Sequence, residues 1–176
     1  MSPFDTNWSF INEGNLIPEG FFFAGISAGL KASRKKDLAL IVAPEGSTCS
    51  GMFTQSIVRA SCVEICEQRI KRSSGLVRAI LINSGQANAC TGNFGTQHFL
   101  TATSKVSELL GIEEQEVLMC STGVIGIPIP INNLLQKLPQ LVSELKVNSF
   151  QNAAEAILTT DLTLSLIHIS EPTRPY

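Results

Sequence analysis

The alternation of hydrophobic and polar positions along the 176-residue chain predicts four short strands and three amphipathic helices. Short apolar or β-branched runs, bounded by polar residues, predict strands at 38–43, 52–58, 76–82 and 117–120. Two turns separate them, at Pro44-Glu45-Gly46 and at Ser73-Ser74-Gly75, because these residue types favour tight chain reversals.

The predicted helices span 97–110, 132–145 and 151–158. The first has Thr96 as its expected N-cap and Gly111 as its stop, and the third has Asn148 or Ser149 available as a cap. Strands and helices follow one another without a repeating βαβ rhythm. We therefore expect a layered α+β or sandwich-like fold rather than a doubly wound sheet.

Composition narrows the functional classes. With 44% hydrophobic and 16% charged residues, the chain can bury a substantial core. A net charge of -2 gives no basic footprint, so we expect no nucleic-acid partner. The apolar run 21–30 is short and broken by glycine, and no basic leader precedes it, so we expect no membrane span. Five dispersed cysteines without a secretory signal indicate a reduced, cytoplasmic protein.

The last thirteen residues, 164–176, differ in character from everything before them. The string LSLIHISEPTR matches one reading frame of a transposase sequencing adapter, and we interpret 164–176 as read-through joined to a truncated gene. The alternative is a divergent natural tail. On the read-through interpretation the biological sequence ends near Thr163, and His168 and Glu171 are not site candidates.

A first candidate site segment is 83–92, NSGQANACTG, which follows a predicted strand. Its small residues, two asparagines and two glycines suit a close backbone approach to a ligand, although an ordinary polar turn would have the same composition. Cys90 is a weak candidate nucleophile, because no histidine or other base is near it in sequence and an unassisted cysteine is more often a packing residue.

A second segment is 120–128, CSTGVIGIP, a glycine-interrupted stretch that also leaves a strand. Backbone N–H groups that point together in such a segment can form an oxyanion hole, while a simple strand-to-helix turn is the plainer interpretation. Cys62 and Cys66 lack a second ligand pair, so zinc is disfavoured. We interpret His98 as a surface or packing residue. We interpret the basic run 31–36 as a solvated face.

Several blocks stand out along the chain: PEGF at 18–21, GISAGLK at 25–31, KDLALI at 36–41, NSGQANACTG at 83–92, LGI at 110–112, CSTGVIG at 120–126 and AILTTD at 156–161. These collinear blocks resemble the ornithine acetyltransferase family of arginine biosynthesis. Together they cover roughly residues 16–163. At Gln86 the family more usually has Asn.

The resemblance implies an αββα-type sandwich and transfer of an acetyl group from N-acetylornithine to glutamate, with acetyl-CoA as a further donor in some members. It implies self-cleavage into an alpha and a beta chain, in which the new N-terminal threonine of the beta chain is the nucleophile. By motif match, Thr122 and Gly123 would form the oxyanion hole and Thr160 would contact substrate. On this interpretation residues 1–163 are the alpha-chain part, and the nucleophile is absent.

The same resemblance implies no resident cofactor, an alpha2-beta2 heterotetramer with the beta chain, and an inactive fragment when this chain is alone. Two alternatives remain at this stage: a self-cleaving aminopeptidase relative, and a binding or assembly subunit without catalysis. Only residues of the missing half, which would line the substrate pocket, would distinguish an aminopeptidase from an acetyltransferase.

Overall fold

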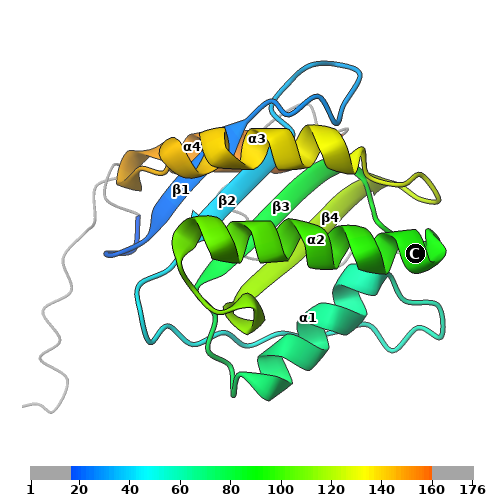
Figure 1. Cartoon of the computed structure of the whole chain (residues 1–176), viewed down its shortest axis with the longest axis horizontal. Helices are drawn as coiled ribbons and strands as arrows, with labels where there is room; N and C mark the ends of the chain where they lie inside the picture. The colour runs from blue at the N-terminus through cyan, green and yellow to red at the C-terminus, as the bar shows by residue number, and fades with distance from the viewer. Residues whose placement is uncertain (1–16, 160–176) are drawn as a thin grey trace, which may run out of the picture.

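The computed structural model describes residues 17–159, which build a four-stranded mixed sheet (Figure 1). The strands lie side by side in chain order: β1 (Phe22–Ile26), β2 (Leu38–Val42), β3 (Ala79–Gln86) and β4 (Val117–Val124). β2 is antiparallel to both β1 and β3, whereas β3 and β4 are parallel. The parallel pair therefore brings the carboxyl ends of β3 and β4 to the same edge of the sheet.

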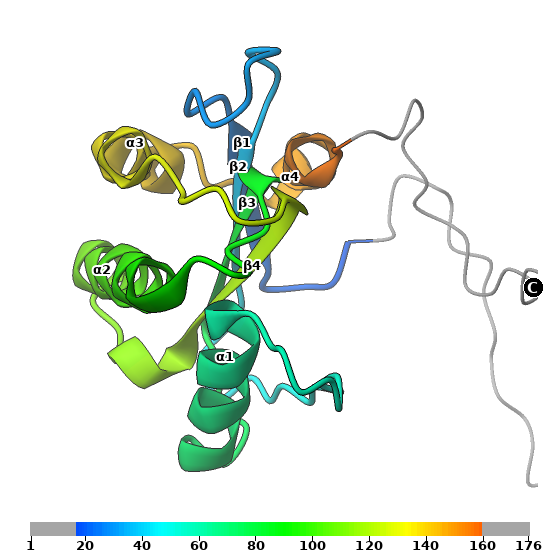
Figure 2. The same cartoon turned by 90° about the vertical axis from the view of Figure 1, so that its right-hand side faces the viewer.

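Helices cover both faces of this sheet, as the edge-on view in Figure 2 shows. Two of them, α2 and α3, pack together over one face, α1 packs against α2 and β4, and α4 lies on the opposite face. Their bounds are α1 Ser61–Arg72, α2 Gly92–Leu110, α3 Ile131–Ser143 and α4 Phe150–Ile157, with short 3-10 turns η2 at Glu114–Glu116 and η3 at Val147–Ser149.

The larger core lies between the sheet and the helices α1, α2 and α3. Alternate residues of a strand point to the same face, so every second apolar side chain enters this layer. Burial of each large aliphatic side chain contributes about 1.5–3 kcal/mol before chain entropy is counted. The fully buried side chains of this core include Leu38, Leu40, Leu81 and Met119 from the sheet and Phe99, Val106, Leu134 and Leu138 from the helices.

On the other face, α4 packs through small residues that permit a very close approach. A Cβ atom added to Gly25 would lie 2.0 Å from the carbonyl oxygen of Asn152, so the backbone of α4 rests directly on β1. Only glycine fits there. The buried residues of this second cluster are Phe23, Ala39, Ile82, Ala153 and Ala156.

Helix α1 is fastened to β4 by three buried residues at helical spacing, Cys62, Cys66 and Arg69. The Cys66 thiol donates a hydrogen bond to the carbonyl oxygen of Met119 at 3.3 Å. The Arg69 guanidinium donates to the carbonyl oxygen of Val117 at 2.5 Å, and burial lowers the pKa of this arginine. These contacts hold α1 beside the strand that carries one of the candidate site segments.

Much of the predicted secondary structure is confirmed. The three expected helices are present as α2, α3 and α4, and both predicted turns form. Gly111 ends α2 in the left-handed conformation, with φ 65°. The layered α+β fold is likewise confirmed by a sheet with helices on both faces.

Other predictions are wrong. Residues 52–58 form no strand, and Met52 and Ile57 are fully exposed there. Thr96 does not cap α2, because the helix already begins at Gly92; its hydroxyl donates instead to the Ser61 hydroxyl at 3.3 Å. Ser149 precedes α4 but makes no side-chain capping hydrogen bond. Strand β1 and helix α1 were not predicted.

Two further observations concern function. No helix within residues 17–159 has the length and apolar character needed to cross a membrane. In the same part of the chain, no group of three or more His, Cys, Asp or Glu residues could hold a metal ion.

Candidate active site

The two candidate segments lie side by side at one edge of the sheet. Both were expected to be loops after strands, but 83–86 is the end of β3 and 121–124 is the end of β4. The parallel register pairs Ser84 with Thr122 and Gly85 with Gly123. Segments far apart in the sequence therefore form a single site.

The backbones of these strand ends approach each other closely. Gly85 has φ 122° and Gly123 has φ 131°, conformations that L side chains rarely adopt. A Cβ atom on Gly123 would lie 2.4 Å from the carbonyl carbon of Gly85, where no atom can be accommodated without a backbone shift. Both positions therefore require glycine. The composition of the segment indicated a close backbone approach, and here the approach is between the two strand ends.

Side chains on opposite faces of these strand ends have different partners. On the face toward α1, the Ser121 hydroxyl donates to Asn83 Oδ1 at 2.6 Å, and Asn83 Nδ2 donates to the carbonyl oxygen of Gln86 at 3.0 Å. On the other face, the Ser84 hydroxyl donates to the carbonyl oxygen of Ala156 in α4. The side chains of Asn83, Ser84 and Ser121 are thereby hydrogen-bonded, whereas the buried Oε1 of Gln86 has no partner among the described residues.

The side chain of Thr122 points to a face of the sheet that follows from the alternation of side chains along a strand. It is the register partner of Ser84, so the two side chains lie on the same face of the sheet, which is the face covered by α4. Thr122 is half-buried and Gly123 is exposed. The hydroxyl of Thr122 and the backbone N–H of Gly123 are thus adjacent donors at an accessible strand end, next to the helix that leads toward Thr160.

Thr160 itself lies outside the described residues, as does the stretch 164–176. The last described residue is Thr159, which is exposed after the end of α4. The substrate contact assigned to Thr160 and the boundary at residue 163 therefore remain predictions.

A buried carboxylate organises the loop that lies over Gly85. Asp37 is fully buried, and its carboxylate accepts hydrogen bonds from the backbone N–H groups of Ala28, Leu30 and Lys31 at 2.6, 2.7 and 3.0 Å. Three donors in fixed positions stabilise a buried negative charge. The loop is also bonded to β3, because Gln86 Nε2 donates to the Leu30 carbonyl oxygen at 2.8 Å.

Part of the basic run 31–36 is not a solvated face. The Lys31 ammonium donates to the carbonyl oxygen of Leu158, just past α4, and to that of Lys36 at 3.0 Å. Burial lowers the pKa of Lys31, an effect that the nearby Asp37 opposes. Lys36 donates to side chains of α4, while Arg34 and Lys35 are exposed as expected.

Three cysteines line a cavity of about 330 Å³ between α1 and β4. Burial raises the pKa of the Cys62 thiol and raises that of Cys66 to about 12. The Cys66 thiol is therefore protonated at neutral pH and is a poor nucleophile, since the thiolate is the reactive species. The third, Cys120, precedes Ser121 and also has a raised pKa, mainly through desolvation.

Two other sequence candidates gain no catalytic partner. Cys90 is exposed in a left-handed backbone conformation, with φ 56°. His98 lies in α2 with its ring 6.2 Å from that of Phe94, and burial lowers its pKa. Neither residue lies in the paired strand ends that carry Thr122 and Gly123.

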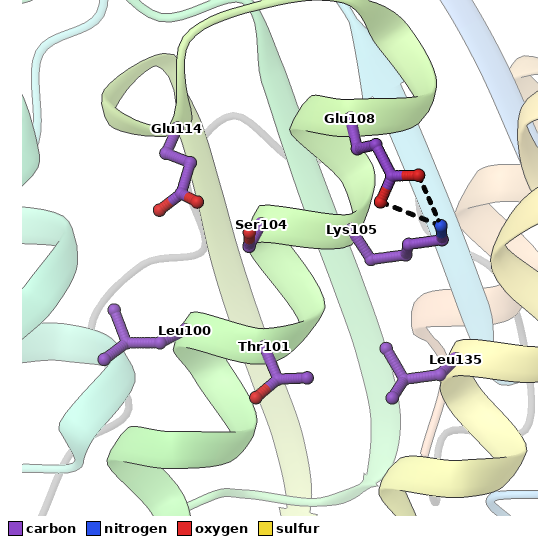
Figure 3. Close-up of a pocket in the computed structure, with 7 residues that line it drawn as sticks. All are labelled: Leu100, Thr101, Ser104, Lys105, Glu108, Glu114 and Leu135. Atoms are coloured by element: carbon purple, nitrogen blue, oxygen red, sulfur yellow. Dashed lines mark hydrogen bonds and ion pairs between the residues drawn. The ribbon is translucent and has the colours of Figure 1, made fainter.

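A hollow of about 640 Å³ lies along α2, next to η2 and α3 (Figure 3). It is open, and two of its charged residues, Lys105 and Glu108, bond to each other at 2.7 Å, as expected of a solvated helix face. None of its lining residues belongs to the paired strand ends, so we assign it no role.

The chain is similar to known proteins over most of its length. The model of the ArgJ family matches residues 22–172, a range that includes part of the stretch interpreted as read-through. A curated relative from Prochlorococcus marinus strain CCMP1986, "Arginine biosynthesis bifunctional protein ArgJ", is 76% identical over 152 residues, which are 86% of this chain and 38% of that protein. A relative of the same name from strain NATL2A is 53% identical over 160 residues, 91% of this chain and 38% of that protein.

Two solved structures are also similar. The ornithine acetyltransferase of Mycobacterium tuberculosis, complexed with ornithine, is 36% identical with a TM-score of 0.79, covering 83% of this chain and 79% of that one. The arginine biosynthesis bifunctional protein ArgJ of Bacillus halodurans is 33% identical with a TM-score of 0.76, covering 82% and 75%. The chain spans about 38% of the length of the curated relatives.

Proposed function

The chain belongs to the ArgJ family, and from that premise we propose that it is the alpha-chain part of an acetyltransferase that moves the acetyl group of N-acetylornithine to glutamate. The relatives' name places them in arginine biosynthesis, and a structural neighbour is an ornithine acetyltransferase with ornithine bound. The membership favours this function over the aminopeptidase alternative.

The observation that carries the proposal is the pairing of Thr122–Gly123 with Ser84–Gly85 at one sheet edge. When a nucleophile attacks an acetyl carbonyl, negative charge develops on the carbonyl oxygen. Donors that are already in place stabilise that charge only in the transition state. The Thr122 hydroxyl and the Gly123 N–H are such donors, fixed by a strand pair that glycine alone permits.

We propose that the nucleophile is the N-terminal threonine of a beta chain, whose own amino group takes the hydroxyl proton. The threonine oxygen adds to the acetyl carbonyl carbon and forms a tetrahedral intermediate. The amide C–N bond of N-acetylornithine then breaks, and the amino group returns its proton to the departing amine, which leaves as ornithine. The amine of glutamate adds to the acetyl-threonine ester and gives a proton to the same amino group, and the threonine oxygen leaves with that proton as N-acetylglutamate forms. Two half-reactions through an acetyl-enzyme give ping-pong kinetics.

Thr160 is proposed to contact the substrate. In support, helix α4, which precedes Thr160, is hydrogen-bonded to the end of β3. The Ala156 carbonyl oxygen accepts from the hydroxyl of Ser84, which is the register partner of Thr122. A side chain shortly after α4 therefore starts from the same face of the sheet as the proposed oxyanion hole.

The remaining features of the assembly are part of the same proposal. The chain would pair with the beta chain of its precursor in an alpha2-beta2 heterotetramer, in the cytoplasm. It would need no resident cofactor, and acetyl-CoA would serve only as a second acetyl donor. Alone, it would be inactive.

A chimera tests the proposed function. Residues 17–159 of this chain would replace the matched segment of the full-length Prochlorococcus marinus CCMP1986 relative, and acetyl transfer from N-acetylornithine to glutamate would be measured. We expect ping-pong turnover from the chimera and none from the 176-residue chain by itself. A folded chimera that binds ornithine without turnover would instead support the binding-subunit alternative.

A further inference from the structure

The buried amide of Asn83 joins the ends of β3 and β4 on the face toward α1. Asn83 is fully buried, its Oδ1 accepts from the Ser121 hydroxyl at 2.6 Å, and its Nδ2 donates to the Gln86 carbonyl oxygen at 3.0 Å. A carbonyl oxygen can only accept, so the amide has one orientation and Ser121 is the donor of the shorter bond. Both ends of this side chain are therefore in use.

The two hydrogen bonds end on either side of the contact between Gly85 and Gly123. Along β3, the bond from Asn83 to Gln86 spans Gly85, whose φ of 122° bends the strand. Across the ladder, Ser121 lies two residues before Gly123 in β4. A single side chain thus fixes the bend in β3 and the position of β4 beside it.

The backbone of β4 alternates between β3 and the outer edge of the sheet, because β4 is the last strand in the order. The Val124 carbonyl oxygen faces β3, since it accepts from the Ala87 N–H at 2.9 Å. The carbonyl oxygens of Val117 and Met119 face outward and accept from side chains of α1. By this alternation the N–H of Gly123, an exposed residue, also faces outward and lies outside the ladder.

Donors of an oxyanion hole must stay in place while charge develops, and a misplacement of about 1 Å can cost about a hundredfold in rate. An outer strand is held by a neighbouring strand on one side only. Gly123 has no side chain that could hold its own backbone. The bond between Ser121 and Asn83 supplies a restraint directly before Thr122.

We propose that Asn83 and Ser121 are positioning residues for the acetyl transfer, whose hydrogen bond holds the Thr122 hydroxyl and the Gly123 N–H where the oxyanion forms. This inference rests on the proposed function. It adds two residues that act through the donors and do not themselves touch the substrate. A bond that served stability alone would leave turnover per folded molecule unchanged when it is removed.

Three variants of the active chimera test the proposal. Ser121→Ala removes the hydroxyl, Ser121→Thr keeps it, and Thr103→Val is a matched control that removes a buried hydroxyl of α2, which donates to the Phe99 carbonyl oxygen at 3.0 Å. We expect Ser121→Ala to lower kcat about tenfold to a hundredfold, with KM for N-acetylornithine within a few-fold, because the donors act in the transition state. Ser121→Thr should recover most of the turnover, and Thr103→Val should match the parent. A folded Ser121→Ala enzyme whose kcat equals that of Thr103→Val would overturn the proposal.

Double variants separate positioning from an independent contribution. If Ser121 acts through the donors, Ser121→Ala combined with Thr122→Ala should lose clearly less kcat than the product of the two single losses. If the bond to Asn83 carries the effect, Ser121→Ala should change kcat by less than about twofold once Asn83→Ala is present. Losses that multiply in either pair would overturn the proposal, and the first pair decides alone if Asn83→Ala does not fold.

A second readout does not depend on activity. In the 176-residue chain, the Ala87 N–H bonds to β4 at the paired strand ends, whereas the Ala43 N–H bonds to the residue just before β3, at the opposite end of the sheet. Ser121→Ala should speed amide hydrogen exchange at Ala87 by about tenfold relative to Thr103→Val and leave exchange at Ala43 unchanged. Equal exchange at Ala87 in the two variants, or equal acceleration at both amides, would contradict the positioning.

Failure of the proposed function would look different from failure of this inference. The unsubstituted chimera would then transfer no acetyl group, while the local difference in exchange at Ala87 persisted.

Discussion

Gly123 lies directly against Gly85, so close that a Cβ atom on Gly123 would come within 2.4 Å of the Gly85 carbonyl carbon and within 2.8 Å of the Gln86 nitrogen. The atoms that obstruct the space belong to the backbone and cannot rotate away. This contact fixes the end of β4 against the end of β3 and sets the position of the Thr122 hydroxyl beside it.

Gly123→Ala should therefore destabilise the fold as well as remove activity. The left-handed φ of 131° alone costs a non-glycine residue about 1–2 kcal/mol, and the backbone clash adds to this cost, so we expect a loss of about 3 kcal/mol or more. Urea unfolding of the 176-residue chain measures it. Gly126→Ala is the matched control, because Gly126 has φ 81° but nothing within 4 Å of its Cβ position. Equal stabilities of the two variants would contradict the close contact.

Asp37→Asn should also be costly, although it removes no volume. The carboxylate accepts three backbone N–H groups in a fully buried site, and an amide would bring its own N–H donors toward them. We expect a loss of about 2–4 kcal/mol in the free energy of unfolding. Glu45→Gln, at an exposed turn, should change it by less than about 0.5 kcal/mol. A neutral Asp37→Asn would show that the loop does not depend on this carboxylate.

Stability should fall at alkaline pH because of the Cys66 thiol. Its pKa is about 12 in the folded protein, against 9.0 for an ordinary cysteine thiol, so between these values the unfolded chain holds fewer protons than the folded one. The free energy of unfolding must then decrease as pH rises above about 9. Between pH 8 and pH 10 we expect Cys66 to contribute about 1 kcal/mol of this loss.

Cys66→Ala is the variant that checks this contribution. It should be less stable than the parent at pH 8, because a buried side chain is shortened, but its stability should decline less between pH 8 and pH 10. Parallel declines in parent and variant would exclude Cys66 as a source of the pH dependence. The pKa of the buried Cys62 thiol is raised as well, so some decline should remain in the variant.

The periodic parts of the fold could be predicted from the sequence, and the parts that depend on distant partners could not. Helices α2, α3 and α4 carry regular apolar faces, and Gly111 marks a helix end by its backbone freedom. The segment 52–58 has the composition of a strand, yet no neighbour pairs with it in the described structure. Helix α1 has a signal in the sequence, because Cys62, Cys66 and Arg69 stand at helical spacing, but the sequence analysis considers the two cysteines only as metal ligands.

The candidate site was predicted as two loops and is one pair of strand ends. Asn83 and Ser84 look like turn residues in the sequence, because their polar side chains seem unsuited to a buried strand. Hydrogen bonds from Ser121 and to Ala156 satisfy them, and both partners are distant in sequence. Lys31 was missed for the same reason, since its bond to Leu158 exists only once α4 packs on the sheet.

The most direct measurement is the steady-state kinetics of Thr122→Ala in the active chimera, with Thr122→Ser as the matched control that keeps the hydroxyl. If the hydroxyl stabilises the oxyanion, the alanine variant should lose about a hundredfold to a thousandfold in kcat, or about 3–4 kcal/mol, with KM for N-acetylornithine within a few-fold. The serine variant should keep most of its turnover. A thermal melt of each protein accounts for any loss of fold. A folded Thr122→Ala enzyme with full kcat would remove Thr122 from the site.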